Sequence, residues 1–454
     1  MGCRLREVLE DYTIINIGPE PLPPVLPQAG NMREAFLMKA ELIEKAYAVA
    51  KDRYAAIGVN TDKVLDQLQK QQISLHCWQT DDVVGFERND ALSGGIQTTG
   101  NYPGRARNID EVRQDIEFVK SLLAGNHRLN LHEIYGDFGG KFVDRDQCGP
   151  EHFQSWIEWA RENKMMLDFN STSFSHPKSG ELTLSNPDKS IRDFWIEHTK
   201  RCRRIADAMG KAQGDPCIMN IWVHDGSKDM PVQRKKYREI LAASLDEIME
   251  ERLDGVKNCF EAKLFGIGLE SYTVGSHDFY TAYCATRKQM YTLDTGHYEQ
   301  TENVSDFVST LLMYVPELML HVSRPVRWDS DHVTIMNDQT LDLFKELVRS
   351  DALDRAHVGL DYFDASINRI GAYIIGTRAT QKCILQALLE PKELLRQYED
   401  NGQYFERLAL MEEAKSLPFG AVFDYFNLKN NVPVGEEYIQ CIQEYERNVT
   451  SKRS

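Results

Sequence analysis

The sequence has no run of about 18 consecutive apolar residues, the length that a membrane-spanning helix requires. Residues 1–31 contain acidic side chains and prolines where a secretion signal needs a continuous apolar segment. Basic residues are also in deficit, since 53 Lys and Arg against 69 Asp and Glu give a net charge of −16, which repels nucleic-acid phosphates and anionic lipids. We therefore predict a cytoplasmic protein that binds neither nucleic acid nor membrane.

Two further patterns are missing. The nine cysteines are odd in number and contain no Cys-x-x-Cys pair, a distribution typical of reduced thiols in a cytosol. The His-x-His sequence that usually opens the metal site of an amidohydrolase is also absent. A disulfide framework is therefore not expected, and a metal-dependent hydrolase becomes a secondary interpretation.

Apolar runs that fit β-strands alternate along the chain with helical patterns. Apolar side chains recur at helical spacing in residues 34–52, 109–123, 193–209, 237–251 and 341–348. Eight runs are predicted to be strands, at residues 73–78, 129–135, 166–169, 218–223, 259–263, 290–294, 318–322 and 357–361. Eight strands separated by helices predict an α/β fold, a TIM (β/α)8 barrel with an N-terminal helix and a C-terminal helical extension.

The chain divides into three predicted parts. Residues 1–32 form an N-terminal arm, expected to be poorly ordered because residues 19–27 are rich in proline. Residues 33–391 form the barrel, which we predict to be the catalytic domain. Residues 392–454 form the helical extension, which we expect to act in oligomerisation.

Metal-ligating side chains end four consecutive predicted strands. Glu261, Asp294, His321 and Asp361 are separated by 33, 27 and 40 residues, each about the length of one strand-plus-helix unit. Polar groups in these positions meet at the C-terminal mouth of a barrel. Three carboxylates and one imidazole suit Mn²⁺ or a related cation better than they suit zinc bound by thiolates.

A second set of ligands lies close by in the sequence. His297 follows Asp294 by three residues, and Asp329 and Asp331 are expected to alternate on one face of an extended loop after the seventh strand. Asp294 can therefore bridge two cations. Any one aspartate here is more often a helix cap or a solvated loop residue, and His321 alone could be a core histidine. The agreement of seven positions favours two metal centres.

Lys263 follows Glu261 by two residues, so both side chains leave the same face of the strand. An ammonium group in this acidic mouth either neutralises surplus carboxylate or holds a substrate oxygen. The glycine-containing segment 81–95 after the first strand is either a lid over the mouth or a plain surface loop.

Six runs of this sequence resemble the L-rhamnose isomerase family, at residues 75–82, 220–222, 261–268, 270–276, 321–332 and 359–369. The resemblance extends from about residue 33 to about residue 450 and leaves out the first 31 residues. The order Glu, then Asp-x-x-His, then Asp-x-Asp is also similar to the more distant xylose isomerases. His321 stands where those enzymes have a carboxylate, which favours the rhamnose branch.

The resemblance implies a cytoplasmic homotetramer whose activity depends on two divalent cations per subunit, preferably Mn²⁺. It implies that Glu261, Asp294, His321 and Asp361 hold a structural cation, whereas His297, Asp329 and Asp331 hold a catalytic one. The implied sugar-binding residues are His132, Trp222, Lys263 and His297, and the implied catalytic residues are Lys263 and Asp361.

The implied reaction interconverts L-rhamnose and L-rhamnulose, with O1 and O2 of the open-chain sugar held by the cations and Lys263 at O1. A hydride shift and an enediol route use the same groups. Val84 or Phe86 either meets the methyl group of the 6-deoxy sugar or packs within the rim. The alternatives are an isomerase of another aldose, a metal-dependent hydrolase and a sugar-binding protein without activity.

Overall fold

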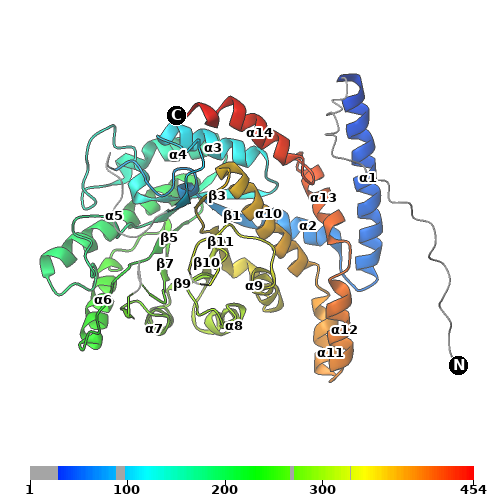
Figure 1. The fold of residues 1–454 in the computed structure, drawn as a ribbon. Helices are drawn as coiled ribbons and strands as arrows, with labels where there is room; N and C mark the ends of the chain where they lie inside the picture. The colour runs from blue at the N-terminus through cyan, green and yellow to red at the C-terminus, as the bar shows by residue number, and fades with distance from the viewer. Residues whose placement is uncertain (1–28, 88–97, 266–269, 328, 454) are drawn as a thin grey trace, which may run out of the picture.

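The fold is a closed parallel barrel, described here from a computed structural model for residues 29–87, 98–265, 270–327 and 329–453. Each barrel strand pairs with its neighbours in chain order, and the last strand returns to the first. The strands are β1 (Gln72–His76), β3 (Asn126–His132), β4 (Met166–Asn170), β5 (Cys217–Ile221), β7 (Val256–Glu261), β9 (Met290–Asp294), β10 (Leu318–Val322) and β11 (Ala356–Leu360). The predicted (β/α)8 barrel is confirmed (Figure 1).

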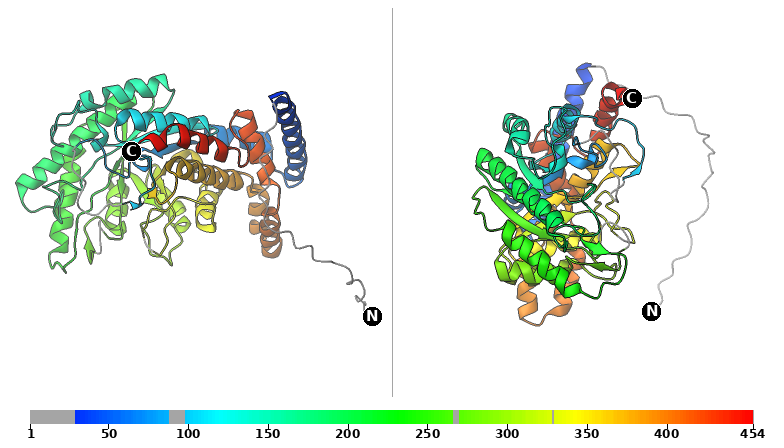
Figure 2. Two further views of the ribbon diagram at one scale, coloured as in Figure 1. Left: turned by 45° about the horizontal axis from the view of Figure 1, so that its top comes forward. Right: turned by 90° about the vertical axis from the view of Figure 1, so that its left-hand side faces the viewer.

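Every barrel strand is followed by a helix, as the alternating sequence pattern predicts. After α1 (Ala29–Ala55) and α2 (Thr61–Lys70), these helices are α3 (Ile109–Ser121), α4 (Gln154–Glu162), α5 (Lys189–Gln213), α6 (Arg234–Ile248), α7 (His277–Arg287), α8 (Ser305–Tyr314), α9 (Asp338–Arg349) and α10 (Arg369–Leu388). They surround the barrel and bury its outer face (Figures 1 and 2).

Asparagine side chains cap the N-termini of four described helices, α2, α3, α9 and α10. The side chains of Asn60, Asn108, Asn337 and Asn368 each accept a hydrogen bond from a backbone N–H three residues later. Such a side chain satisfies one of the N–H groups that the first helical turn leaves unpaired. The position of each asparagine in the sequence therefore fixes where its helix begins.

The barrel interior is built in layers, because alternate residues of each strand point inward. Ile218, Cys259, Met290 and Met319 form a buried apolar cluster inside β5, β7, β9 and β10. Two residues farther along the same strands stand Asn220, Glu261, Thr292 and His321, so the next inward-facing layer is polar. The functional residues therefore rest on an apolar floor.

Short elements that the sequence pattern did not predict extend the mouth of the barrel. The chain turns into single 3₁₀ turns at Cys77–Gln79 and Glu133–Tyr135, where the first two strands were expected to continue. Two small sheets form from the loops: β2 (Thr99–Gly100) with β12 (Asp364–Ala365), and β6 (Gly226–Ser227) with β8 (Tyr272–Thr273). The loops are thereby tied to one another around the C-terminal ends of the strands.

Most helices outside the barrel gather on one side of the molecule, while α14 (Tyr438–Asn448) runs back along the barrel beside α3 (Figures 1 and 2). Those on that side are α1 together with α11 (Lys392–Asp400), α12 (Tyr404–Ala414) and α13 (Phe419–Lys429). The rings of Tyr47 and Tyr425 stack at 3.9 Å between α1 and α13. Helix α1 begins at Ala29, so residues 29–32 are helical rather than part of the predicted arm, and residues 1–28 lie outside the described residues.

None of the helices in the described part of the chain combines the length and the apolar character needed to cross a membrane.

Candidate metal centre

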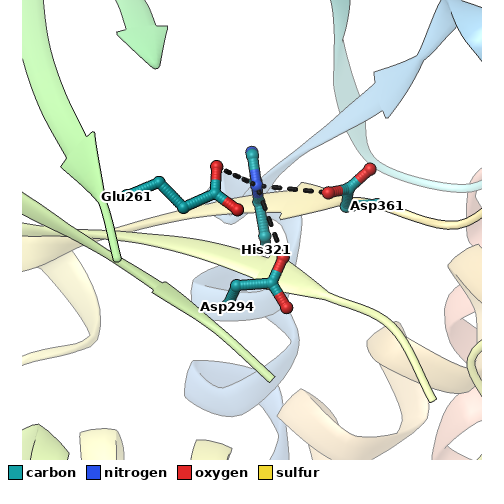
Figure 3. A group of neighbouring side chains, drawn as sticks. All are labelled: Glu261, Asp294, His321 and Asp361. Carbon is teal, nitrogen blue, oxygen red and sulfur yellow. Dashed lines mark ion pairs between the residues drawn. The ribbon is translucent and has the colours of Figure 1, made fainter. Parts of the chain in front are cut away.

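Four side chains from consecutive strands converge at the mouth of the barrel. The ligand atoms of Glu261, Asp294, His321 and Asp361 lie within 4.8 Å of one another. The Nδ1 atom of His321 lies 3.3 Å from Glu261 Oε2, 3.4 Å from Asp361 Oδ2 and 3.7 Å from Asp294 Oδ2. Figure 3 shows the three carboxylates facing this imidazole from different sides. The four residues, which are separated in the sequence by about one strand-plus-helix unit each, therefore lie next to one another in the fold.

Several buried atoms of this group have no hydrogen-bond partner among the described residues. They include both nitrogens of His321 and the Oδ2 atom of Asp294. An unpaired buried polar atom costs about 1–3 kcal/mol, so such atoms mark a place where a ligand completes the structure. The donor set of three carboxylates and an imidazole fits a divalent cation of the Mn²⁺ type.

The charges of the group are strongly interdependent. Burial lowers the pKa of His321, but the charges of Glu261, Asp361 and Asp294 outweigh burial and raise it to about 9. Burial raises the pKa of Glu261, yet the imidazoles of His321 and His297 lower it to about 2. The carboxylates therefore need a positive charge among them, and a bound cation would supply it in place of the protons.

A second group shares Asp294 with the first. The ligand atoms of Asp294, His297 and Asp329 also lie within 4.8 Å of one another. The Nε2 atom of His297 is 3.4 Å from Asp329 Oδ2 and 3.7 Å from Asp294 Oδ2, whereas Nδ1 donates to the carbonyl of Ala262 at 2.8 Å. Because Nδ1 is engaged, Nε2 is the nitrogen that remains available to a cation.

Gly296 allows the two groups to approach each other. A Cβ atom at this position would lie 2.6 Å from Asp329 Oδ1 and 3.2 Å from Asp294 Oδ1. The backbone N–H of Gly296 also donates to Asp294 Oδ1 at 2.6 Å. Any larger residue would therefore push apart the two carboxylates that the second group needs.

Asp331 does not join this second group in the way the sequence pattern predicted. Its φ of 43° lies in the left-handed region, so the loop is not extended there and the alternation with Asp329 is lost. The Asp331 carboxyl lines the same pocket. Burial and the charges of Asp329 and Asp361 raise its pKa well above the usual range.

Lys263 points into the pocket from the loop after β7. Its Nζ lies 2.9 Å from Asp329 Oδ2 and 4.6 Å from the centre of the Trp222 ring. Burial lowers the pKa of Lys263, but the charges of Asp329 and Asp331 outweigh it and keep the ammonium group protonated. The indole Nε1 of Trp222 has no partner among the described residues. The pocket lining therefore contains an unpaired N–H donor, from Trp222, beside the ammonium group of Lys263.

Aromatic rings form the opposite wall of the pocket. Trp78, His132, Phe174 and Trp222 follow one another with ring centres 4.8, 5.8 and 5.9 Å apart. Burial lowers the pKa of His132 to about 3, so its ring is neutral, and Nδ1 lies 3.2 Å from Thr172 Oγ1. The pocket therefore has the acidic ligand groups on one side and an aromatic wall on the other. This arrangement suits a polyhydroxylated ligand that has one apolar end.

Sequence reasoning did not assign three residues that line this pocket, Trp78, Asn220 and Val83. Trp78 follows the first strand, and its Nε1 donates to Asp361 Oδ1 at 3.1 Å. Asn220, which donates to Glu261, was noted only as part of a run. Val83 lines the pocket, whereas the Phe86 ring packs edge-on against Tyr135 at 5.6 Å. Residues 88–95 of the segment 81–95, predicted to be either a lid or a plain surface loop, lie outside the described residues.

Comparisons with known proteins agree on one family. The sequence profile of the family described as L-rhamnose isomerase (RhaA) matches residues 41–453. The chain is 68% identical to an L-rhamnose isomerase of Bacteroides thetaiotaomicron over 418 residues, which cover 92% of this chain and all of that protein. It is 53% identical to the enzyme of the same name from Rhodopirellula baltica over 424 residues, 92% of this chain and 98% of that one. This chain therefore belongs to the L-rhamnose isomerase family.

Proposed function

We propose that this protein interconverts L-rhamnose and L-rhamnulose in a reaction that requires two divalent cations, with Mn²⁺ preferred. The observation that carries the proposal is the pair of ligand groups that share Asp294 in one pocket with Lys263. The reaction class is supported by membership of the family, and the metal requirement by the unpaired buried atoms of His321 and Asp294.

Glu261, Asp294, His321 and Asp361 would hold one cation, and Asp294, His297 and Asp329 the other, with Asp331 nearby. When bound, these cations supply positive charge to the sugar oxygens O1 and O2, between which the reaction redistributes electrons. The group around His321 joins four strand ends, so we assign it the structural part. Apart from the shared Asp294, the group around His297 lies on loops, so we assign it the catalytic part.

Lys263 would stabilise negative charge that develops on O1, because its ammonium group is buried, charged and directed into the pocket. Asp361 would contribute to catalysis as a ligand of the cation in the group around His321, and the Trp78 indole holds that carboxylate by a hydrogen bond. The neutral ring of His132 and the Nε1 of Trp222 would contact sugar hydroxyls, and the row of aromatic rings excludes water from the reacting carbons.

Removal and return of metal ions tests the proposal. Dialysis against EDTA should abolish formation of the ketose from L-rhamnose, and Mn²⁺ should restore it better than Mg²⁺ or Ca²⁺, because imidazole ligands favour a transition metal. The ketose is measured after each addition, with other aldoses assayed in parallel. Full activity in the metal-free protein would refute the metal requirement, and a faster reaction with another aldose would refute the substrate.

We also infer that the protein works in the cytoplasm as a homotetramer. The cytoplasmic inference is supported by the acidic composition and by the cysteines of the described residues, all of them free thiols. The tetramer is supported by apolar side chains of α12 that face solvent in the single chain.

A further inference from the structure

A pair of polar residues that the mechanism does not use lies beside Glu261. Asn220 on β5 and Thr292 on β9 stand on either side of β7 and belong to the same inward-facing layer as Glu261. Asn220 Nδ2 donates a short hydrogen bond to Glu261 Oε2, and Asn220 Oδ1 accepts one from Thr292 Oγ1 at 2.8 Å. All three side chains are buried.

The hydroxyl of Thr292 holds the Asn220 amide in the orientation that the Glu261 carboxylate selects. Because a carboxylate can only accept, the NH₂ group of Asn220 is the end that meets Glu261, and Oδ1 is the end that accepts from Thr292. The thiol of Cys259, 3.7 Å from the same Oδ1, supports this orientation. If the amide turned over, its oxygen would face the Glu261 carboxylate, and the two negative ends would repel each other.

Glu261 needs this support more than its neighbours do. A glutamate has one more rotatable bond than an aspartate, so holding it in one position costs more side-chain entropy. The two aspartates of the group have donors of their own, Gly296 N–H for Asp294 and Trp78 Nε1 for Asp361. Among the described residues, Asn220 is the only neutral side-chain donor to Glu261 for which a hydrogen bond is recorded.

We propose that Thr292 is a positioning residue that acts through Asn220: its hydroxyl orients the amide, the amide holds the Glu261 carboxylate, and this sets the cation affinity of the group around His321. The inference rests on the proposed metal-dependent function. Neither residue belongs to the two groups of ligand atoms, so in this proposal each acts through Glu261. Partners of metal ligands in this position typically change metal affinity by about 10–100-fold.

The test compares Mn²⁺ binding to chelator-stripped proteins by isothermal titration calorimetry. Thr292→Val keeps the shape and removes the hydroxyl, so the amide loses its orienting donor, and Mn²⁺ affinity should fall by about tenfold or more. Thr292→Ser keeps the hydroxyl and should bind within about threefold of wild type. Equal affinity in Thr292→Val and wild type would overturn the proposal.

Thr380→Val is the matched control. This threonine is fully buried in α10, outside the barrel, and donates to the carbonyl of Gly376 at 2.9 Å. The control should show the general loss of melting temperature that follows removal of a buried hydroxyl, with Mn²⁺ affinity unchanged. If Thr380→Val weakens Mn²⁺ binding as much as Thr292→Val does, the effect is one of stability and the proposal is wrong.

A double variant tests whether Thr292 acts through the amide. In an Asn220→Ala background the hydroxyl has nothing to orient, so adding Thr292→Val should change Mn²⁺ affinity by less than about twofold. An undiminished effect would overturn the proposed route. If the valine prevents folding, Thr292→Ala removes the same hydroxyl without filling its space. Wild type that binds no Mn²⁺ at all would instead refute the metal-dependent function itself.

Discussion

At the scale of single residues, Lys263 is the side chain whose chemistry separates a catalyst from a metal-binding scaffold. Among the described residues that line the pocket it is the only lysine or arginine. Its ammonium group is paired with Asp329 on one side and lies over the Trp222 ring on the other. To balance charge, Lys263 needs only its contact with Asp329. To contact O1 of the sugar, its ammonium group must also be open to the pocket, which Lys263 lines.

Lys263→Met keeps the aliphatic stem and removes the charge. We expect kcat for L-rhamnose to fall about 10²-fold, as it does when other enzymes lose one donor to a developing oxyanion. Bound Mn²⁺, measured by elemental analysis, should stay at the wild-type value. Lys178→Met is the control, because Lys178 also places its Nζ over an aromatic ring, Phe194 at 3.7 Å, away from the pocket. Turnover within about threefold of wild type would leave Lys263 only a charge-balancing role.

At the scale of elements, the turn after β1 is held in a conformation that its residues do not favour. Asp82 and Val83 have φ values of 63° and 62°, in the left-handed region that a β-branched residue rarely adopts. Asp81 accepts from Gly85 N–H at 2.8 Å and from the Tyr135 hydroxyl at 2.6 Å. Val83 lines the pocket as a result, so the strained turn shapes part of the pocket wall.

Arg369, at the start of α10, clamps this turn from outside. Its guanidinium binds both oxygens of Asp82, at 2.9 and 2.7 Å, and donates to the carbonyl of Tyr102 at 2.6 Å. Arg369→Met should let the turn relax and move Val83, so we expect KM for L-rhamnose to rise about fivefold to tenfold with a smaller change in kcat. Steady-state kinetics with saturating Mn²⁺ measures both constants.

Arg453→Met provides the comparison for Arg369→Met. Arg453 forms a buried pair with both oxygens of Asp115, at 2.6 and 2.8 Å, and neither residue lines the pocket. Both substitutions leave one carboxylate without its partner and should lower the melting temperature. Only Arg369→Met should change KM, and a similar rise in KM for Arg453→Met would mean that the clamp has no specific effect on the pocket.

At the scale of the whole molecule, an ion network closes the end of the barrel opposite the pocket. The carboxylate of Glu317, just before β10, accepts hydrogen bonds from Lys257 Nζ of β7 at 2.8 and 2.9 Å and from His357 Nε2 of β11 at 2.6 Å. The hydrogen bond from His357, with that from Lys257, outweighs burial and lowers the pKa of Glu317 from 4.5 to about 2. A lowered pKa in the folded state means that this network stabilises the fold above about pH 4.5 and loses its effect as the pH falls toward 2.

Glu317→Gln should therefore lower the free energy of unfolding at pH 7 by about 1 kcal/mol, a modest value because the network is partly open to solvent. The difference from wild type should shrink as the pH is lowered below about 4.5. Urea unfolding at a series of pH values measures it. Glu158→Gln, on the exposed face of α4, should show no such difference. A constant gap between Glu317→Gln and wild type down to pH 3 would contradict the network's role.

The proposed tetramer also belongs to this scale. Tyr404, Phe405 and Leu408 of α12 are 62%, 80% and 59% exposed in the single chain, on helices that project from the barrel (Figure 1). Phe405→Asp combined with Leu408→Asp should reduce the particle from four chains of 52.1 kDa to a smaller assembly, as measured by light scattering. Val232→Asp, at a residue 96% exposed elsewhere, should leave the mass unchanged. A particle of four chains in the double variant would exclude α12 from the interface.

The amino-acid sequence by itself determined the strands and the alternation with helices, because apolar periodicity and asparagine caps are local properties of the chain. It also placed Glu261, Asp294, His321 and Asp361 at the mouth, since a residue that ends a barrel strand faces that mouth whatever the neighbouring strands contain. Their roles as ligands stay a prediction, as does the division of the chain at residue 392.

Only the tertiary structure decided which side chains from different strands touch. Trp78 meets Asp361 across 283 residues of sequence, and Thr292 reaches Asn220 past the intervening strand. These contacts depend on the register between strands, which no local pattern specifies. The left-handed φ values at Val83 and Asp331 are likewise imposed by surrounding contacts against the preference of the residues themselves. The sequence therefore determines where the chemistry lies, and packing determines how each group is held.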